Sequence, residues 1–270
     1  MRGVDTLVDG LIRNGWLLAF LLAVGVWEVV APRYRLVASR SLRWPTSFTL
    51  GPLNALLVSV PLAPLVVATA LTARGGMLAA DTVLGPGLAI AVSVVLLDLV
   101  SYGQHRLLHA VPLLWSVHRV HHSDVDFDYT TAFRFHPIEA VLTNVISFAC
   151  VALLGVPALA LLVHQTLAGG LTVLEHANAR IPSPIEAWAG RVFVTPGMHR
   201  LHHSAEPHDT DSNFATIFSF WDRWLGTYSP PASGRRDDLE IGLREFREPK
   251  YLTLPWTLAI PFLPNPHPHT

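Results

Sequence analysis

The sequence predicts an all-α fold of the multi-pass membrane class, with about three spanning helices plus a membrane hairpin and a cytoplasmic, histidine-rich helical cap. The 270 residues are 51% hydrophobic and only 14% charged, whereas soluble domains carry about 25% charged residues. Several uncharged stretches are long enough to cross a bilayer. Eleven of the 14 histidines lie between residues 105 and 203, so one central region is rich in side chains that bind metals.

The first membrane helix is predicted over residues 15–31, which are apolar apart from Glu28. A group of arginines follows this stretch, as is typical of a helix that leaves the membrane on the cytoplasmic side; they are Arg33, Arg35, Arg40 and Arg43. A cleaved signal peptide is the alternative interpretation. It is disfavoured because signal peptides carry their charge before the apolar stretch, and here more of the charge follows it.

The second and third spans are predicted from two further uncharged stretches. Residues 44–73 contain no Asp, Glu, Lys or Arg, and this length exceeds the roughly 20 residues that cross a bilayer. Pro61 and Pro64 predict kinks there. Residues 82–97 are again uncharged and continue through Asp98 to His105, so we expect a third helix that leaves the membrane carrying the first histidines.

A membrane hairpin is predicted over residues 140–174, which are free of charge and are interrupted by Gly155-Val-Pro157. As one helix this stretch would span about 52 Å, too long for one crossing and short for two. Histidine clusters flank it on both sides, so a segment that enters and returns would bring them together. From residue 181 the chain is more polar, and the apolar residues 251–263 are too short to span and are expected to dock at the interface or on the core.

Three histidine clusters carry the chemical signal: His105-Arg-Leu-Leu-His109, His118-Arg-Val-His121-His122-Ser and His199-Arg-Leu-His202-His203-Ser. Residues at i, i+3 and i+4 lie on one face of a helix, so we expect each cluster to direct its imidazoles toward one point. Imidazole suits iron, copper, nickel and zinc. Eight such nitrogens exceed what one tetrahedral zinc ion can use, which predicts two metal ions.

Longer motifs extend this signal from about residue 84 to residue 263. They are Asp98-Leu-Val-Ser-Tyr102-Gly-Gln-His105, Phe133-Arg-Phe-His136-Pro-Ile-Glu139, Glu175-His176-Ala-Asn178, Asp211-Ser-Asn213-Phe-Ala and Phe220-Trp-Asp222-Arg-Trp-Leu-Gly226-Thr. With the three clusters, they resemble the fatty acid hydroxylase / sterol desaturase superfamily of membrane di-iron oxygenases. The resemblance implies a helical membrane domain that binds two iron ions on its cytoplasmic face and uses O2 to hydroxylate or desaturate a lipid.

The resemblance also implies the site residues. The metal ligands would be the eight clustered histidines and a ninth in the family's His-x-Asn position: His105, His109, His118, His121, His122, His176, His199, His202 and His203. A further set would either orient an imidazole through its other ring nitrogen or bind metal directly: Asp98, His136, Glu139, Asn178 and Asp222. Helix capping and local polar pairing are the alternative roles for that second set.

Partners follow from the same resemblance and from composition. The chain has one cysteine and we expect no haem domain beside the membrane core, so electrons would come from a separate ferredoxin, cytochrome or reductase. The substrate would be a sterol, fatty acyl or related membrane lipid. A net charge of −1 gives no basic surface for nucleic acid. Arginine outnumbers lysine 18 to 1, which favours a bacterial inner membrane.

Two other functions are compatible with clustered histidines: a membrane zinc-dependent hydrolase and a non-catalytic metal-binding membrane protein. The hydrolase is disfavoured because the chain has no His-Glu-x-x-His motif. We expect N-terminal spans over residues 1–80, the catalytic di-iron domain over residues 81–230 and an interfacial tail over residues 231–270. Outside the clusters, ordinary structural roles are expected for His164, His208, His267 and His269.

Overall fold

The computed structural model describes residue 15 and residues 18–72, 85–230 and 239–264. Within these ranges the regular secondary structure is helical, with isolated β-bridges in place of strands. Three helices are long and apolar enough to cross a membrane: α4 (Pro86–Ala110), α6 (Pro137–Leu154) and α7 (Ala158–Glu175). The all-α membrane class predicted from composition is therefore confirmed.

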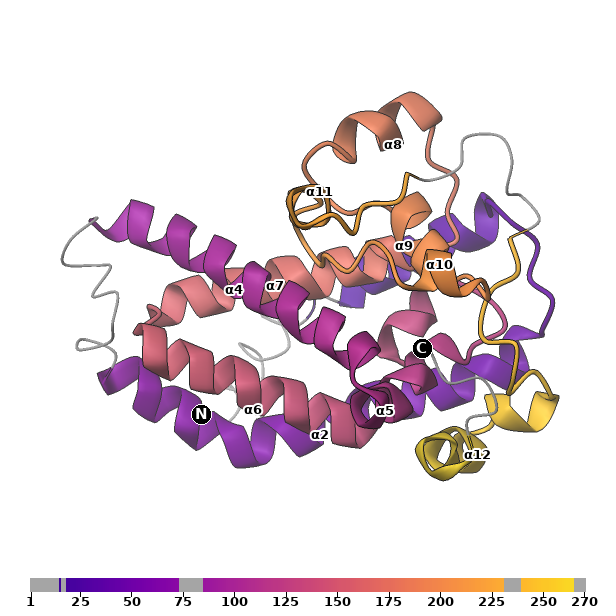
Figure 1. Cartoon of the computed structure of the whole chain (residues 1–270), viewed down its shortest axis with the longest axis horizontal. Helices are drawn as coiled ribbons and strands as arrows, with labels where there is room; N and C mark the ends of the chain where they lie inside the picture. Colours follow the sequence, from indigo (N-terminus) through magenta and orange to yellow (C-terminus); the bar gives the residue numbers. More distant parts are fainter. Residues whose placement is uncertain (1–14, 16–17, 73–84, 231–238, 265–270) are drawn as a thin grey trace, which may run out of the picture.

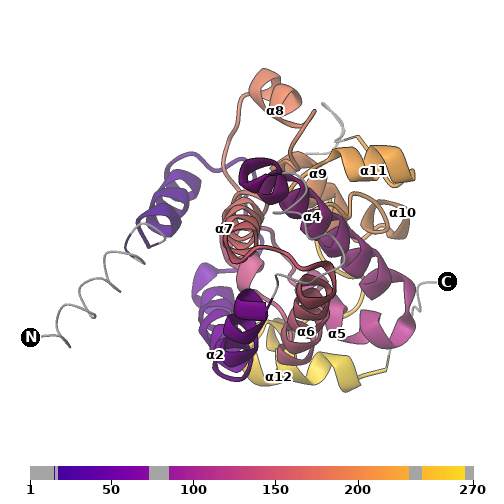
Figure 2. The same cartoon turned by 90° about the vertical axis from the view of Figure 1, so that its left-hand side faces the viewer.

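The long helices form an elongated bundle (Figure 1). Helix α2 (Arg40–Thr72) packs against α6, and α4 packs against both α6 and α7. Figure 2, which looks along the bundle, shows α2, α4, α6 and α7 arranged around a common axis. Leu97 of α4, Phe148 of α6 and Leu161 of α7 meet in one buried apolar cluster. Apolar side chains therefore fill the space between these three helices there.

The N-terminal apolar stretch forms a shorter helix, Leu18–Val30. Its Val24 packs with Tyr129 and Val173, and the carboxylate of Glu28 accepts hydrogen bonds from the backbone N–H groups of Tyr129 and Asn178. Glu28 is therefore buried against protein. Pro61 and Pro64 both lie inside helix α2, which continues past them to Thr72.

The predicted hairpin is present as α6 and α7, joined at Gly155-Val-Pro157. Proline at the first position of α6 suits a helix start, because its missing N–H would have no partner there. Gly155 ends α6 with φ of 68°, a left-handed conformation that favours glycine. At about 1.5 Å per residue, each 18-residue helix is about 27 Å long, close to the thickness of the hydrocarbon core.

Short helices cover one end of the bundle, and we call them the cap. They are α5 (Pro112–His122), η2 (Tyr129–Phe133), α8 (Ser183–Ala189), α9 (Pro196–His202), α10 (Pro207–Thr210), α11 (Phe220–Leu225), η3 (Pro249–Leu252), α12 (Leu254–Ala259) and η4 (Ile260–Phe262). The C-terminal segment docks on the core, since Arg119 of α5 donates to the carbonyls of Ile260 and Leu263 at 2.6 Å each.

Buried arginines fix the cap to the bundle. Arg43, near the start of α2, is fully buried and pairs with Asp124 at 2.6 and 2.9 Å and with Asp128 at 2.6 Å. Arg134 is equally buried and donates to Ser123 and to the carbonyl of Tyr251. The three nitrogens of the Arg43 guanidinium are thereby all bonded to carboxylates, and the bonds of both arginines hold the loop that follows α5 in one position.

Candidate metal centre

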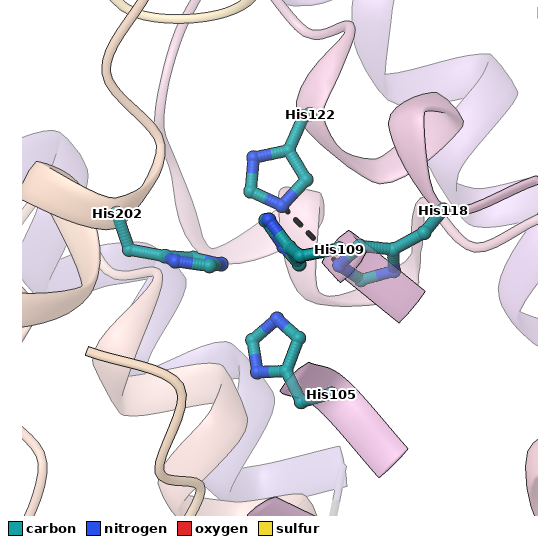
Figure 3. Close-up of side chains that lie close together, drawn as sticks. All are labelled: His105, His109, His118, His122 and His202. Carbon is teal, nitrogen blue, oxygen red and sulfur yellow. Dashed lines mark hydrogen bonds between the residues drawn. The ribbon is translucent and has the colours of Figure 1, made fainter. Parts of the chain in front are cut away.

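Nine histidines gather where the cap meets the bundle, and they form two groups. The first group contains His105, His109, His118, His122 and His202, and the second contains His121, His176, His199 and His203. Within each group, one ring nitrogen per residue lies within 4.8 Å of the corresponding nitrogens of the others. Figure 3 shows the five rings of the first group pointing toward a shared centre from three separate segments. These are the nine predicted ligands.

The two repeated motifs each contribute to both groups, so the expectation that each cluster points toward one place was wrong. On α5, His118 and His122 belong to the first group and His121 to the second. At α9 the order is reversed: His202 belongs to the first group, while His199 and His203, the residue directly after the helix, belong to the second. Adjacent helical residues are rotated by about 100°, which prevents neighbouring imidazoles from reaching the same point.

The Nε2 atoms are the ones that converge. In the second group, Nε2 of His176 lies 3.2 Å from that of His121, 3.3 Å from that of His203 and 3.0 Å from that of His199. In the first group, the Nε2 atoms of His118 and His122 are 3.3 Å apart. Nitrogens bound about 2 Å from one ion would be about 3 Å from each other, so these spacings fit a metal ion at each centre.

In three of these histidines the opposite ring nitrogen is hydrogen-bonded to a backbone carbonyl, which orients the ring. Nδ1 of His105 bonds to the carbonyl of Phe214 at 2.8 Å, and Nδ1 of His202 to that of Ser212 at 2.7 Å. Nδ1 of His176 bonds to the carbonyl of Thr172 at 2.7 Å. A carbonyl accepts only, so each Nδ1 carries the proton and each Nε2 presents a lone pair. Nε2 of His105 and of His202 are buried without a hydrogen-bond partner in the protein, as metal ligands would be.

Burial favours the neutral form of six of these imidazoles. Loss of solvent lowers the pKa of His176 to about 4 and that of His202 to about 3. Burial, reinforced by neighbouring histidines, also lowers the pKa well below its usual value in other members of both groups: His121, His122, His199 and His203. Only the neutral imidazole can bind a metal, so the environment favours the binding form at neutral pH.

Two carboxylates contact ligand histidines directly. Glu139 of α6, predicted for such a role, accepts a hydrogen bond of 2.7 Å from Nδ1 of His118. Asp211 lies 3.1 Å from Nδ1 of His109 and was not assigned a role from the sequence. It precedes the Ser-Asn213-Phe-Ala segment, yet nothing in its spacing indicated the bond, because His109 is 102 residues away in the chain.

The other polar residues predicted to orient imidazoles bind backbone instead. Asp98 accepts from the N–H groups of Ile217 and Phe218. Asp222 accepts from the N–H groups of Phe214 and Ala215, which places the carbonyl that holds His105. These loops have buried N–H groups that need acceptors, and the carboxylates satisfy them. Asp98 and Asp222 therefore act on the loops behind the ligands.

Asn178 and His136 likewise have local structural partners. The side-chain amide of Asn178 exchanges hydrogen bonds with the backbone of Tyr34. Nδ1 of His136 caps α6 by accepting from the N–H of Ile138 at 3.2 Å, and His136 belongs to neither histidine group. Polar pairing and helix capping, the alternatives to metal roles, thus describe their observed contacts.

The other described histidines belong to neither group. His208 lies at the surface and His164 is a buried residue of α7. His267 and His269 lie outside the described residues.

A cavity of about 410 Å³ opens beside both groups. Its lining comes from α2, α4, α6 and α7 of the bundle, together with η2 and the histidines. His105 and His118 of the first group reach its wall, and so do three of the second group: His121, His176 and His199. A molecule in this cavity would therefore contact both centres at once.

Comparison with known proteins agrees with this arrangement. The family model described as fatty acid hydroxylase matches residues 90–227. The chain is 28% identical over 145 residues to alkylglycerol monooxygenase of Caenorhabditis elegans, covering 53% of this chain and 27% of the relative. It is 28% identical over 153 residues to ornithine lipid hydroxylase OlsE of Rhizobium tropici, covering 56% and 45%. It is 30% identical over 143 residues to sphingolipid C4-hydroxylase sur2 of Schizosaccharomyces pombe, covering 51% and 47%.

The matched segment thus spans less than half the length of each of these relatives. No solved structure matches the chain. The family model covers half of the sequence and includes all nine histidines of the two groups. The chain therefore belongs to the fatty acid hydroxylase family.

Proposed function

We propose that this protein is a membrane-bound di-iron oxygenase that uses O2 and external electrons to hydroxylate or desaturate a C–H bond of a lipid. One observation carries the proposal: members of two groups of imidazoles, nearly all buried, line a single cavity among membrane helices. Two bound ferrous ions would supply the reduction of dioxygen and an oxidant for an unactivated C–H bond. Iron fits the donor set because imidazole binds it well and nine nitrogens in groups of five and four exceed the needs of one ion.

The chain's own residues would prepare this chemistry. Glu139, Asp211 and two loop carbonyls hold the four imidazoles of His118, His109, His105 and His202 with their lone pairs inward. Asp98 and Asp222 hold those loops. Partners behind metal ligands typically change metal affinity by about 10–100-fold. Burial of the histidines excludes bulk water from the reacting centre.

The substrate class follows from the surroundings and the relatives. The cavity lies within the bundle formed by α2, α4, α6 and α7, and three of these helices are suited to a bilayer by length and hydropathy. The named relatives are an alkylglycerol monooxygenase, an ornithine lipid hydroxylase and a sphingolipid C4-hydroxylase. These names favour hydroxylation over desaturation for this chain. The electrons would come from a ferredoxin, cytochrome or reductase.

The arginines support a cytoplasmic position for the histidine site. Arg33, Arg35 and Arg40 line one surface pocket together with Arg180, and Arg200 of α9 lies over the ring of Tyr34 at 3.7 Å. The basic segment after the first apolar helix is therefore on the same side as the histidine-bearing cap. Under the positive-inside rule that side faces the cytoplasm, which in a bacterium is the inner face of the inner membrane.

The decisive experiment is metal analysis of the detergent-purified protein, combined with Mössbauer spectroscopy after growth on iron-57. We expect about two irons per chain as a coupled pair, followed by lipid-dependent O2 uptake with a reductase and ferredoxin. Zinc alone after iron-replete, anaerobic preparation would overturn the proposal and favour a hydrolase or a metal-binding protein. Two irons without O2 uptake on any lipid class would overturn the oxygenase activity alone.

A further inference from the structure

A second pocket, which we call the arginine pocket, lies at the surface just before helix α2. Its volume is about 620 Å³, and its lining is Pro32, Arg33, Tyr34, Arg35, Leu36, Arg40 and Arg180. Four of these seven residues are arginines and none is acidic. Arg180 comes from the segment that follows α7, so two distant parts of the chain supply the positive charge.

Two of the four guanidinium groups have an acidic neighbour outside the pocket lining. Arg33 donates to a carboxylate oxygen of Glu186 at 2.7 Å, and Arg40 lies 3.8 Å from that of Glu28. The side chains of these arginines are still 27% and 33% exposed. Nε of Arg40 is buried and has no hydrogen-bond partner in the described part of the protein. Both arginines therefore keep donors for a further acceptor.

The other two guanidinium groups have no acidic neighbour. Arg35 and Arg180 are exposed, and neither makes an ion pair or a side-chain hydrogen bond within the described residues. Arg200 of α9 adds another positive charge beside the pocket, because its guanidinium lies 3.7 Å from the ring centre of Tyr34. Like charges repel one another and destabilise a compact state. An anion bound between them would remove this repulsion.

Backbone hydrogen bonds fix the two segments that carry the arginines. The N–H of Arg33 donates to the carbonyl of Asn178 at 3.0 Å, and the N–H of Arg180 to that of Ala31 at 2.9 Å. The side-chain amide of Asn178 exchanges hydrogen bonds of 2.9 Å with the backbone of Tyr34. The pocket is therefore already formed in the free protein, which reduces the entropic cost of binding a ligand.

The type of side chain indicates the type of anion. The planar guanidinium group donates two parallel hydrogen bonds to phosphate oxygens, and several arginines can share one phosphate. Basic pockets beside membrane helices also bind the headgroups of anionic lipids. Pro32 and Leu36 supply apolar surface in the same lining, which would contact whatever the phosphate is attached to.

We propose that the arginine pocket binds a phosphate group, with Arg35 and Arg180 as its main ligands. The group would belong to free phosphate or to the headgroup of an anionic phospholipid. It would join the segment before α2 to the segment after α7, because these two arginines come from different segments. No residue of this pocket lines the cavity beside the histidines, so the site is independent of metal binding and of the oxygenase reaction.

Thermal unfolding of the full-length protein in a neutral detergent, followed by circular dichroism, tests the proposal. One arm compares inorganic phosphate with sodium chloride at equal ionic strength. The other compares short-chain phosphatidylglycerol with short-chain phosphatidylcholine, whose choline compensates the phosphate charge. We expect a saturable rise of Tm with phosphate, phosphatidylglycerol or both, because a ligand of the folded state stabilises it.

The two arms also distinguish the sources. A rise with both phosphate and phosphatidylglycerol supports a site for the phosphate group itself. A rise with phosphatidylglycerol alone supports a lipid site, and a rise with phosphate alone supports a site for the free ion. The absence of a saturable rise in both arms would overturn the proposal.

Variants show whether the rise comes from the pocket. Arg35→Gln and Arg180→Gln should each weaken binding about tenfold, as loss of one charged hydrogen bond does. Arg180→Lys keeps the charge without the planar fork and should lose less. Arg191→Gln is the matched control and should bind as the wild type does, since Arg191 is exposed and does not line the pocket.

Phosphate also stabilises proteins in general by being excluded from their surface, and the variants separate that effect from binding. An equal rise of Tm in the wild type, Arg35→Gln and Arg180→Gln would contradict the assignment. So would a loss of binding in Arg191→Gln as large as in Arg180→Gln. Because no arm measures activity or iron, this proposal and the di-iron proposal succeed or fail separately.

Discussion

His121 and His122 are consecutive in the chain, yet their rings stand at 86° to each other and belong to different histidine groups. The ring of His122 lies 4.4 Å from that of His203, which belongs to the second group. The two groups are thus in contact through their own ligands. Each can still be altered separately, because each of the nine grouped histidines belongs to one group alone.

Replacement of one ligand should therefore empty one centre selectively. In His121→Ala the second group keeps three imidazoles, and in His202→Ala the first keeps four. We expect each variant to lose activity and His121→Ala to retain about one iron per chain, with normal membrane insertion. Metal analysis and Mössbauer spectroscopy measure the result. His208→Ala is the control, since that side chain is 92% exposed; full activity in both ligand variants would contradict a shared site.

Loss of the carboxylate behind His118 should weaken metal binding without removing a ligand. Glu139 accepts a 2.7 Å hydrogen bond from this imidazole, and such partners fix the ring and raise its basicity. We expect Glu139→Leu to lower metal affinity by about 10–100-fold and Glu139→Gln, which keeps an acceptor, by less. Competition with a metal chelator measures the affinity. Equal retention of metal by wild type and Glu139→Leu would show that the bond does not tune the centre.

The metal-free protein should lose stability as the pH falls below about 6.5. An exposed histidine in the unfolded chain has a pKa near 6.5, whereas burial lowers the pKa of His176 to about 4. The unfolded chain therefore binds more protons between these values, and stability falls as the pH is lowered through that window. For His176 alone the loss reaches about 3 kcal/mol. Thermal unfolding of the chelator-treated protein at pH 7 and at pH 5 measures this loss of stability. We expect the difference between the two pH values to be smaller in His176→Gln than in the wild type.

The buried ion pairs of Arg43 should be essential for the cap. This guanidinium bonds to Asp124 and Asp128, and all three side chains are buried. Arg43→Leu would leave two unpaired buried carboxylates, a change that costs about 3–5 kcal/mol. Arg43→Lys should recover only part of this, because an ammonium cannot make the same paired bonds. Denaturation in detergent measures the change, with Arg35→Ala, an exposed arginine, expected to be neutral. Unchanged stability in Arg43→Leu would show that the cap is held elsewhere.

Several features of the fold were predictable because they depend on local sequence. Helix α4 was expected to carry the first histidines out of the membrane, and it holds both His105 and His109. The hairpin was expected at Gly155, where the chain does reverse between α6 and α7. Length, apolar composition and helix-ending residues act within each segment, so the sequence alone is sufficient to place them.

The partners of the histidines could not be predicted in the same way. His105, His176 and His202 are oriented by backbone carbonyls, which every residue possesses. Asp98 and Asp222 were expected behind imidazoles and instead hold loop N–H groups. Which acceptor meets which donor depends on how distant segments pack, and residue type does not encode that choice.

The sequence by itself determined that this is a helical membrane protein and that eight clustered imidazoles gather at its centre, because hydropathy and motif spacing are properties of short segments. The ninth, His176, followed from the family resemblance. Only the tertiary structure decided how those imidazoles divide into groups of five and four. The division arises because successive histidines at α5 and at α9 alternate between the two groups. It also decided that unpaired acceptors of Glu139 and Glu175 lie beside a cavity, since burial and pairing are fixed only when the helices pack.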